Sequence, residues 1–171
     1  MTTETTYTPQ QEKISKILGK VPAGLFIVSA KDASKTPAEG EAGFLASWVQ
    51  QAGFEPPMLT IAFNKKRSCL DLVKASGNLV LNIMAKENGK TMSTFFKPAA
   101  EGKSIFDGLE TFTDETGTPI LKDSLGYMEC KYKSEVESGD HIIVLVEVIN
   151  GGVNNADLEP SVHIRSDGFK Y

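Results

Sequence analysis

The sequence predicts a mainly β fold, a closed antiparallel barrel with a few short helices. Several short runs rich in Val, Ile, Leu and Phe are bounded by Gly, Pro, Asn or Asp, a pattern typical of buried strands. Two later runs have the pattern of a hairpin, and helical patterns are few. Because few helices are long enough to connect parallel neighbours, the pattern favours an antiparallel barrel over a doubly wound sheet.

Composition indicates an ordinary globular chain. It has 171 residues, 40% hydrophobic and 23% charged, with a net charge of −4, which predicts one domain. Basic residues are scattered except at Lys65–Lys66–Arg67, so no nucleic-acid surface is expected. The polar N-terminus lacks a signal-peptide pattern, and no apolar run approaches the length of a membrane helix. We therefore expect a cytoplasmic protein without a membrane partner.

The first element is a short amphipathic helix over Gln10–Leu18, with Ile14, Ile17 and Leu18 on one face and an end at Gly19. Residues 1–20 are thus expected to form a tail and helix, and residues 21–171 the barrel domain. The next elements are apolar runs with strand character, at Gly24–Ala30, Ala42–Trp48, Met58–Phe63 and Leu79–Met84.

The clearest hairpin lies in the second half of the chain. Gly126–Val136 alternates apolar and charged residues, which predicts one wet face carrying Glu129, Lys131 and Lys133. A turn at Glu137–Asp140 leads into the apolar strand His141–Asn150.

Three further elements complete the prediction. Helices are expected at Ser68–Ala75 and Lys86–Phe96, and a last short strand at Val162–Arg165. Ala99–Gly108 is expected to be a loop.

Several classes of catalytic site have no motif here. The sequence contains no GxGxxG after a strand, no GxxxxGK[ST], no HExxH and no GxSxG. His141 and His163 are not spaced as a metal pair, and Cys69 and Cys130 are predicted to be buried small hydrophobes. We expect no metal site.

A basic turn is the first positive signal. Lys65–Lys66–Arg67 follows a strand, and Ser68 opens a helix with Asp71 three residues later, an arrangement similar to a capping box. Gly77 is placed to end that helix. A helix start beside cations can hold a phosphate monoester. The alternative is a solvated basic turn.

The second signal is the segment Ser47–Trp48–Val49–Gln50–Gln51, which brings polar groups into an apolar run. A wall that is apolar on one side and hydrogen-bonding on the other suits a flat ring with polar edges. The alternative is an edge strand with a wet side. His141 has a structural alternative as well, and Phe95–Phe96 alone are typical of core. Asp114–Glu115 and Glu135–Glu137 are expected on solvated faces without an acid–base role.

Taken together, these stretches resemble the flavin reductase-like family of FMN-binding split barrels. The resemblance runs from Val21 to Tyr171 and is strongest to the domain at the C-terminus of cyanobacterial-type flavodiiron proteins. It rests on five stretches in the same order: ASWVQQAGFEPP at 46–57, VLNIMA at 80–85, PILKDSLGYMEC at 119–130, SGDHIIVLVEV at 138–148 and HIRSDGFKY at 163–171.

The resemblance implies a Greek-key split β-barrel and a homodimer with FMN near the interface. The residues that would face the flavin ring are Leu45, Ala46, Ser47 and Trp48. The residues that would hold the ribityl phosphate are Asn64, Lys65, Arg67 and Ser68. Asn82 and Ile83 would lie beside the cofactor, Phe95 and Phe96 would close over it, and His141 would lie on the nicotinamide side.

The implied function is hydride transfer from NADH or NADPH to FMN, with electrons passed to an acceptor that the sequence does not identify. Ser47 and His141 would act there as positioning residues. One alternative is an FMN-carrying electron-transfer module without NAD(P)H activity, serving a protein such as a rubredoxin-like donor, an oxygenase or an oxidase. Another is a degenerate barrel kept for dimerisation.

The sequence departs from the family pattern at three places. Trp48–Gln51 replaces a Ser/Thr-rich run, Leu70 stands where a Thr is common, and Lys170–Tyr171 replaces a His-Tyr ending.

Overall fold

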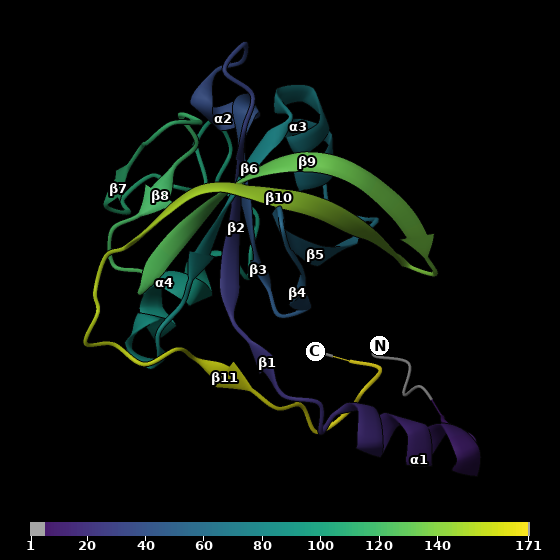
Figure 1. Ribbon diagram of the computed structural model, residues 1–171. Helices are drawn as coiled ribbons and strands as arrows, with labels where there is room; N and C mark the ends of the chain where they lie inside the picture. Colours follow the sequence, from purple (N-terminus) through teal and green to yellow (C-terminus); the bar gives the residue numbers. More distant parts are fainter. Residues whose placement is uncertain (1–5, 171) are drawn as a thin grey trace.

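A seven-stranded antiparallel sheet dominates the computed structural model, which describes residues 6–170 (Figure 1). The sheet curves so that β3 at one edge contacts β5 near the other. In sheet order the strands are β3 (Glu41–Ala46), β2 (Phe26–Lys31), β6 (Asn78–Ile83), β9 (Gly126–Ser138), β10 (His141–Val153), β5 (Pro57–Asn64) and β4 (Val49–Phe54). The predicted mainly β fold is confirmed.

Two small ladders and short helices surround the sheet. The ladders pair β1 (Ala23–Gly24) with β11 (Val162–His163) and β7 (Thr111–Phe112) with β8 (Ile120–Leu121). The helices are α1 (Pro9–Leu18), α2 (Pro37–Gly40), α3 (Cys69–Ser76), the 3₁₀ turn η1 (Lys86–Asn88) and α4 (Gly89–Thr94). None of the helices in the described part of the chain is long and apolar enough to cross a membrane.

The apolar strand residues form two clusters. The larger one includes Val28, Phe63 and Val144 and lies between the sheet and α3. The smaller one includes Ile27, Met84 and Phe95 and lies toward α4. Both predicted buried cysteines belong to the larger cluster, so they pack as small hydrophobes.

The predicted hairpin is confirmed, with β9 and β10 joined at Gly139–Asp140. Its predicted wet face is wrong at one residue, because the Glu129 side chain is fully buried. The segment before β8 covers it and supplies donors: the Thr116 amide lies 2.8 Å and the Glu115 amide 3.2 Å from the Glu129 carboxylate. Strand alternation shows which face a residue occupies, but not whether a distant loop covers that face.

The run predicted as one strand through Trp48 is divided. β3 ends at Ala46, and Ser47–Trp48 then carries the chain to β4 at the opposite edge of the sheet. Gln50 and Gln51 are exposed on this edge strand, as the wet-edge alternative expects. Ser47 and Trp48 therefore lie where the barrel closes.

Helix α1 forms as predicted and is followed by Gly19, but its apolar face does not pack on the barrel. Ile17 is 67% exposed, and Ile14 and Leu18 are each 41% exposed. The buried residue of this helix is Ser15, which contacts the C-terminal tail. Figure 1 shows α1 away from the large sheet, with the chain that follows β11 returning to it.

Candidate functional site

Three adjoining cavities surround the end of β3. The first, which we call the central cavity, has a volume of about 450 Å³. Most of its wall is apolar, as is usual in small-molecule sites. Eight of the residues proposed from the sequence line it: Leu45, Ala46, Ser47, Asn64, Arg67, Phe95, Phe96 and His141.

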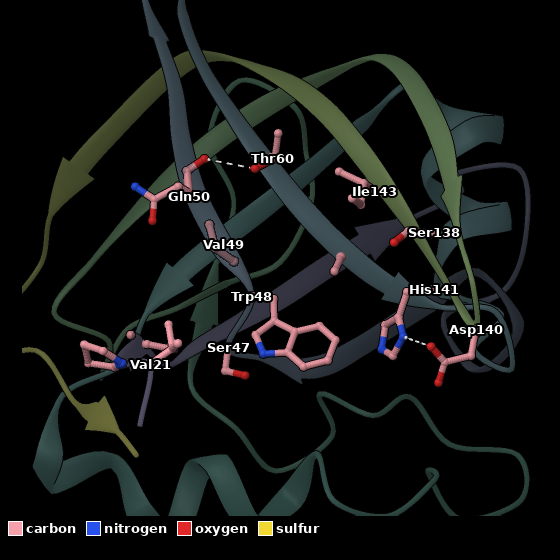
Figure 2. A pocket seen from close by; sticks show the side chains of 14 residues that line it. Val21, Ser47, Trp48, Val49, Gln50, Thr60, Ser138, Asp140, His141 and Ile143 are labelled. Carbon is pink, nitrogen blue, oxygen red and sulfur yellow. Dashed lines mark hydrogen bonds and ion pairs between the residues drawn. The ribbon is translucent and has the colours of Figure 1, made fainter. Parts of the chain in front are cut away.

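The second, the Trp48 cavity, has a volume of about 440 Å³ and shares Ser47, Ala62 and His141 with the central cavity. Figure 2 shows its lining, with the Trp48 ring directed toward His141. The centroids of these two rings are 4.8 Å apart. Ser47 and His141 therefore lie at the junction of two cavities.

The third, the basic cavity, has a volume of about 600 Å³ and shares Phe44, Asn64, Arg67 and Phe96 with the central cavity. Its lining includes the cations Lys66, Arg67 and Lys97, together with Ser68. An apolar chamber thus opens directly into a cationic one. Such a pair suits a ligand with a flat apolar body and an anionic end.

Asn64 shapes the basic turn that separates these chambers. Its side-chain oxygen accepts from the Lys66 amide at 3.0 Å, and its backbone carbonyl accepts from the Arg67 amide at 3.0 Å. The Arg67 guanidinium lies 5.5 Å from the centroid of the Phe44 ring, which holds the charge against the wall. The turn is therefore built in advance of any ligand.

Two details of this turn differ from expectation. The Lys65 ammonium pairs with the Glu137 carboxylate at 3.0 Å, and Lys65 lines none of the three cavities. Ser68 makes no side-chain capping hydrogen bond, because its backbone is already helical at the N-cap position. The expected capping box is thus wrong, although Gly77 ends α3 in the left-handed conformation as predicted.

Phe95 and Phe96 take different places on the cavity wall. Phe95 is 2% exposed and belongs to the smaller core cluster, whereas Phe96 is 65% exposed. Gly43 on β3 makes room for the Phe95 ring, since a Cβ there would lie 2.6 Å from a ring carbon. Phe95 is therefore a fixed part of the floor, and Phe96 is an accessible rim that also borders the basic cavity.

His141 begins β10 and is oriented by its neighbours. Its Nδ1 lies 2.8 Å from Asp140 Oδ1, and this hydrogen bond is the main reason why the pKa of Asp140 is lowered (Figure 2). The Asp140 carboxylate can only accept, so Nδ1 is the donor in this hydrogen bond. The ring is thus held in one orientation at the cavity junction.

Asn82 and Ile83 are not brought to the cavities. The Asn82 side chain is fully buried and donates to the Ile27 carbonyl at 3.0 Å and to Ser29 Oγ at 2.9 Å. Its oxygen accepts from the Leu121 amide at 2.8 Å. Since each of its polar atoms is already bonded, the Asn82 side chain ties strands together instead of contacting a ligand.

Sequence reasoning missed part of the central cavity. Leu25, Met92 and His163 line it, and none of them was proposed. His163 lies in the stretch HIRSDGFKY, which contributes to the family resemblance. No role at the site was predicted for any residue of that stretch. Leu25 and Met92 are apolar residues with no signal that separates them from core.

Thiolate chemistry is disfavoured at both cysteines. Burial raises the pKa of the Cys69 thiol to about 12 and that of the Cys130 thiol to about 12. Both thiols are therefore protonated and inert near neutral pH. Among the described residues, no group of three His, Cys, Asp or Glu side chains is arranged to hold a metal ion.

Comparison with known proteins gives a consistent result. The chain is 38% identical over 159 residues to Diflavin flavoprotein A 1 of Synechocystis sp. (strain ATCC 27184 / PCC 6803 / Kazusa). That match covers 92% of this chain and 27% of the relative, so the chain spans about a quarter of the relative's length.

Solved structures share the fold. The NADH:FAD oxidoreductase SgcE6 of Streptomyces globisporus C-1027 superposes with a TM-score of 0.79 at 20% identity, covering 94% of this chain and 92% of that one. The styrene monooxygenase flavin reductase of Pseudomonas putida S12 gives a TM-score of 0.73 at 16% identity, covering 88% and 92%. Residues 18–170 match the family described as Flavin reductase like domain. The chain belongs to that family.

Proposed function

We propose that this chain is an FMN-binding oxidoreductase that takes a hydride from NADH or NADPH and passes the electrons onward. The observation that carries the proposal is the junction of the central and basic cavities at Asn64 and Arg67. A flavin mononucleotide has the same division, with a flat tricyclic ring at one end and a phosphate at the other. Family membership and the diflavin relative support a flavin as the ligand.

The residues present fit this cofactor. Leu25, Phe44 and Phe95 offer apolar surface for a ring, and the strand end at Leu45–Ser47 offers backbone groups for its polar edge. Arg67 and Lys66 offer charge for a phosphate next to the start of α3. We assign the phosphate to Arg67 and Ser68 with Lys66, and we place Lys65 outside the site because of its bond to Glu137.

The chain itself would bind and orient the flavin and the nicotinamide, and it would exclude water from the site. The bound flavin would supply the redox chemistry by accepting a hydride. Ser47 and His141 border both the central and the Trp48 cavity, so we propose that the nicotinamide enters through the Trp48 cavity and that these two residues position it. We also propose that His163, which lines the central cavity, lies beside the flavin.

The flavin form and the assembly are also part of the proposal. We favour FMN because one cationic turn matches one phosphate monoester. A homodimer with the flavin near its interface is supported by exposed apolar side chains at Val21, which lines the Trp48 cavity, and at Val162 and Ile164, on either side of the central-cavity residue His163. Affinities for riboflavin, FMN and FAD, together with the sedimentation mass of the protein, test both points.

The decisive experiment is anaerobic stopped-flow mixing of the FMN-loaded protein with NADH and, separately, with NADPH. Bleaching of the flavin absorbance by either nucleotide is expected. A spectrum that neither nucleotide bleaches, in protein that dithionite does bleach, would remove the reductase proposal.

A second candidate is an electron-transfer module that carries FMN and exchanges electrons with a protein partner. It is favoured by the 27% share of the diflavin relative that the chain spans, since that relative contains far more than this domain. FMN that stays bound to the protein but is not bleached by NADH or NADPH would support this candidate. Protein that takes up no flavin would select a barrel kept for assembly.

A further inference from the structure

The two ends of the described chain are fastened to each other beside the site. Ser15 Oγ donates to Asp167 Oδ1 at 2.5 Å, and the Gly168 amide donates to the Ser15 carbonyl at 2.8 Å. Tyr7 Oη donates to Asp167 Oδ2 at 3.1 Å. We call this arrangement of residues 7–19 and 165–169 the terminal clasp.

The clasp depends on a glycine at 168. A Cβ on Gly168 would lie 2.4 Å from Leu18 Cβ and 2.6 Å from the Ser15 carbonyl oxygen. Real Cβ atoms do not approach backbone this closely, so any other residue would push the tail away from α1. The clasp is therefore sensitive to a single added methyl group.

Arg165 links the clasp to the cavities. Its backbone amide donates to the Gly19 carbonyl at 2.9 Å, and its Nη1 donates to the Gly168 carbonyl at 3.2 Å. The same guanidinium lies 5.2 Å from the centroid of the Trp48 ring, within the range of a cation–π contact. One side chain thus touches both the fastened tail and the wall of the Trp48 cavity.

Trp48 itself belongs to none of the described strands. It lies in the short connection between β3 and β4 and is 38% exposed. Its backbone carbonyl accepts from the Ala62 amide at 3.0 Å, which holds the main chain but not the ring. The orientation of the indole is set by the groups around it, among them His141 and Arg165.

We infer that Arg165 is a positioning residue for Trp48 and that the terminal clasp thereby controls the shape of the Trp48 cavity. Fastening of the chain ends fixes the guanidinium, the guanidinium fixes the indole, and the indole sets the space beside His141 and Ser47. The consequence for nicotinamide entry rests on the proposed function, whereas the control of Trp48 does not.

The sequence contains one tryptophan and four tyrosines, so fluorescence excited at wavelengths beyond the tyrosine absorption band reports on Trp48 alone. Time-resolved anisotropy and acrylamide quenching are measured on the flavin-free protein, with the variants Arg165→Ala, Arg165→Lys and Gly168→Ala. The matched control is Lys86→Ala, which removes a cation paired with Glu159 ahead of the tail and makes no contact with Trp48.

Arg165→Ala is expected to raise the quenching constant about twofold to fivefold, the population shift that a cation–π contact of ordinary strength supports. Arg165→Lys should restore part of the difference, because it keeps the charge but loses the planar group. Gly168→Ala should act in the same direction from a distance, and Lys86→Ala should match the wild type. If Gly168→Ala does not fold, Asp167→Ala opens the clasp by removing the acceptor of the Ser15 and Tyr7 hydroxyls.

Wild-type quenching and anisotropy in Arg165→Ala would overturn the positioning role. A mobile Trp48 in Arg165→Ala with no change on opening the clasp would overturn the control by the chain ends. In flavin-loaded protein the KM for the nicotinamide nucleotide should rise about twofold to fivefold in Arg165→Ala with a smaller change in kcat. Because the fluorescence is measured without flavin, a failure of the proposed function leaves that result intact.

Discussion

Asn64 directs two of the three cations in the basic turn without being charged. By accepting from the Lys66 and Arg67 amides it bends the backbone so that Lys66 and Arg67 border the basic cavity. Lys65, one residue earlier, turns away to Glu137. Cations that are adjacent in sequence therefore have different roles in space.

The first prediction concerns these cations. Arg67→Ala should weaken FMN binding about 10-fold or more, since a charge-assisted hydrogen bond to phosphate contributes roughly 1.5–3 kcal/mol. Lys65→Ala is the matched control and should change the affinity less than about threefold, as expected for loss of an exposed ion pair. Fluorescence titration of FMN measures both. Equal losses in the two variants would mean that the phosphate lies elsewhere.

The second prediction concerns the cavity floor at Gly43. Gly43→Ala should destabilise the protein by about 1–3 kcal/mol, because the new Cβ would meet the buried Phe95 ring at 2.6 Å. That cost corresponds to a fall in Tm of roughly 2–12 °C. Gly89→Ala, in the lining of the central cavity, is the control: its Cβ meets nothing within 4 Å and it lies in helical backbone, so its Tm should not fall.

At the scale of elements, one buried carboxylate fastens a connection to the barrel. Glu129 on β9 accepts from the Glu115 and Thr116 amides and from the Asn150 side chain on β10. Asp114 in the same connection accepts from Tyr127 Oη at 2.7 Å, and this bond is the main cause that raises the Tyr127 pKa to about 12. The connection before β8 is therefore held by an acceptor on β9, Glu129, and by a donor on β9, Tyr127.

We predict that Glu129→Gln will cost about 1–3 kcal/mol, because the amide group would face donors and leave at least one of them unpaired. Hydrogen exchange at the Glu115 and Thr116 amides should accelerate in this variant. Glu137→Gln, a change at an exposed ion pair, should stay within about 0.5 kcal/mol of the wild type. Unchanged exchange at both amides would show that Glu129 does not hold this connection.

At the scale of the whole molecule, local patterns predicted the elements, and distant contacts decided the details. The β9–β10 hairpin was predictable because alternation and a Gly-Asp turn are local signals. The burial of Glu129 was not, since it depends on a connection that starts elsewhere in the chain. The same holds for the candidate site: Leu45–Ser47 and Arg67, which line the central cavity, were predicted through motifs, whereas the ion pair of Lys65 could be seen only in the fold.

The attachment of α1 is a further detail that distant contacts decide and that the local pattern did not predict. Period 3.6 predicted the helix correctly, but the helix is attached through Ser15 and the tail, not through Ile14 and Ile17. The contacts that fix α1 therefore join the first and last parts of the described chain. These contacts contribute to the stability of the whole molecule, and that contribution depends on pH because one of the groups is the Asp167 carboxylate.

The pKa of Asp167 is lowered, first by the hydrogen bond from the Ser15 hydroxyl, then by the Phe169 amide, Tyr7 and the Lys170 charge. Because the folded value lies below that of the unfolded chain, near 3.9, the unfolded state takes up the proton first as the pH falls. The contribution of Asp167 is therefore complete at neutral pH and is lost as the pH falls from about 5 through the lowered pKa. Urea midpoints between pH 7 and pH 3 should decline less steeply in Asp167→Asn than in the wild type. Ser15→Ala should flatten the decline as well, because it removes the donor whose hydrogen bond is the first cause of the lowered pKa of Asp167. A wild-type slope in both variants would show that the clasp contributes nothing to acid stability.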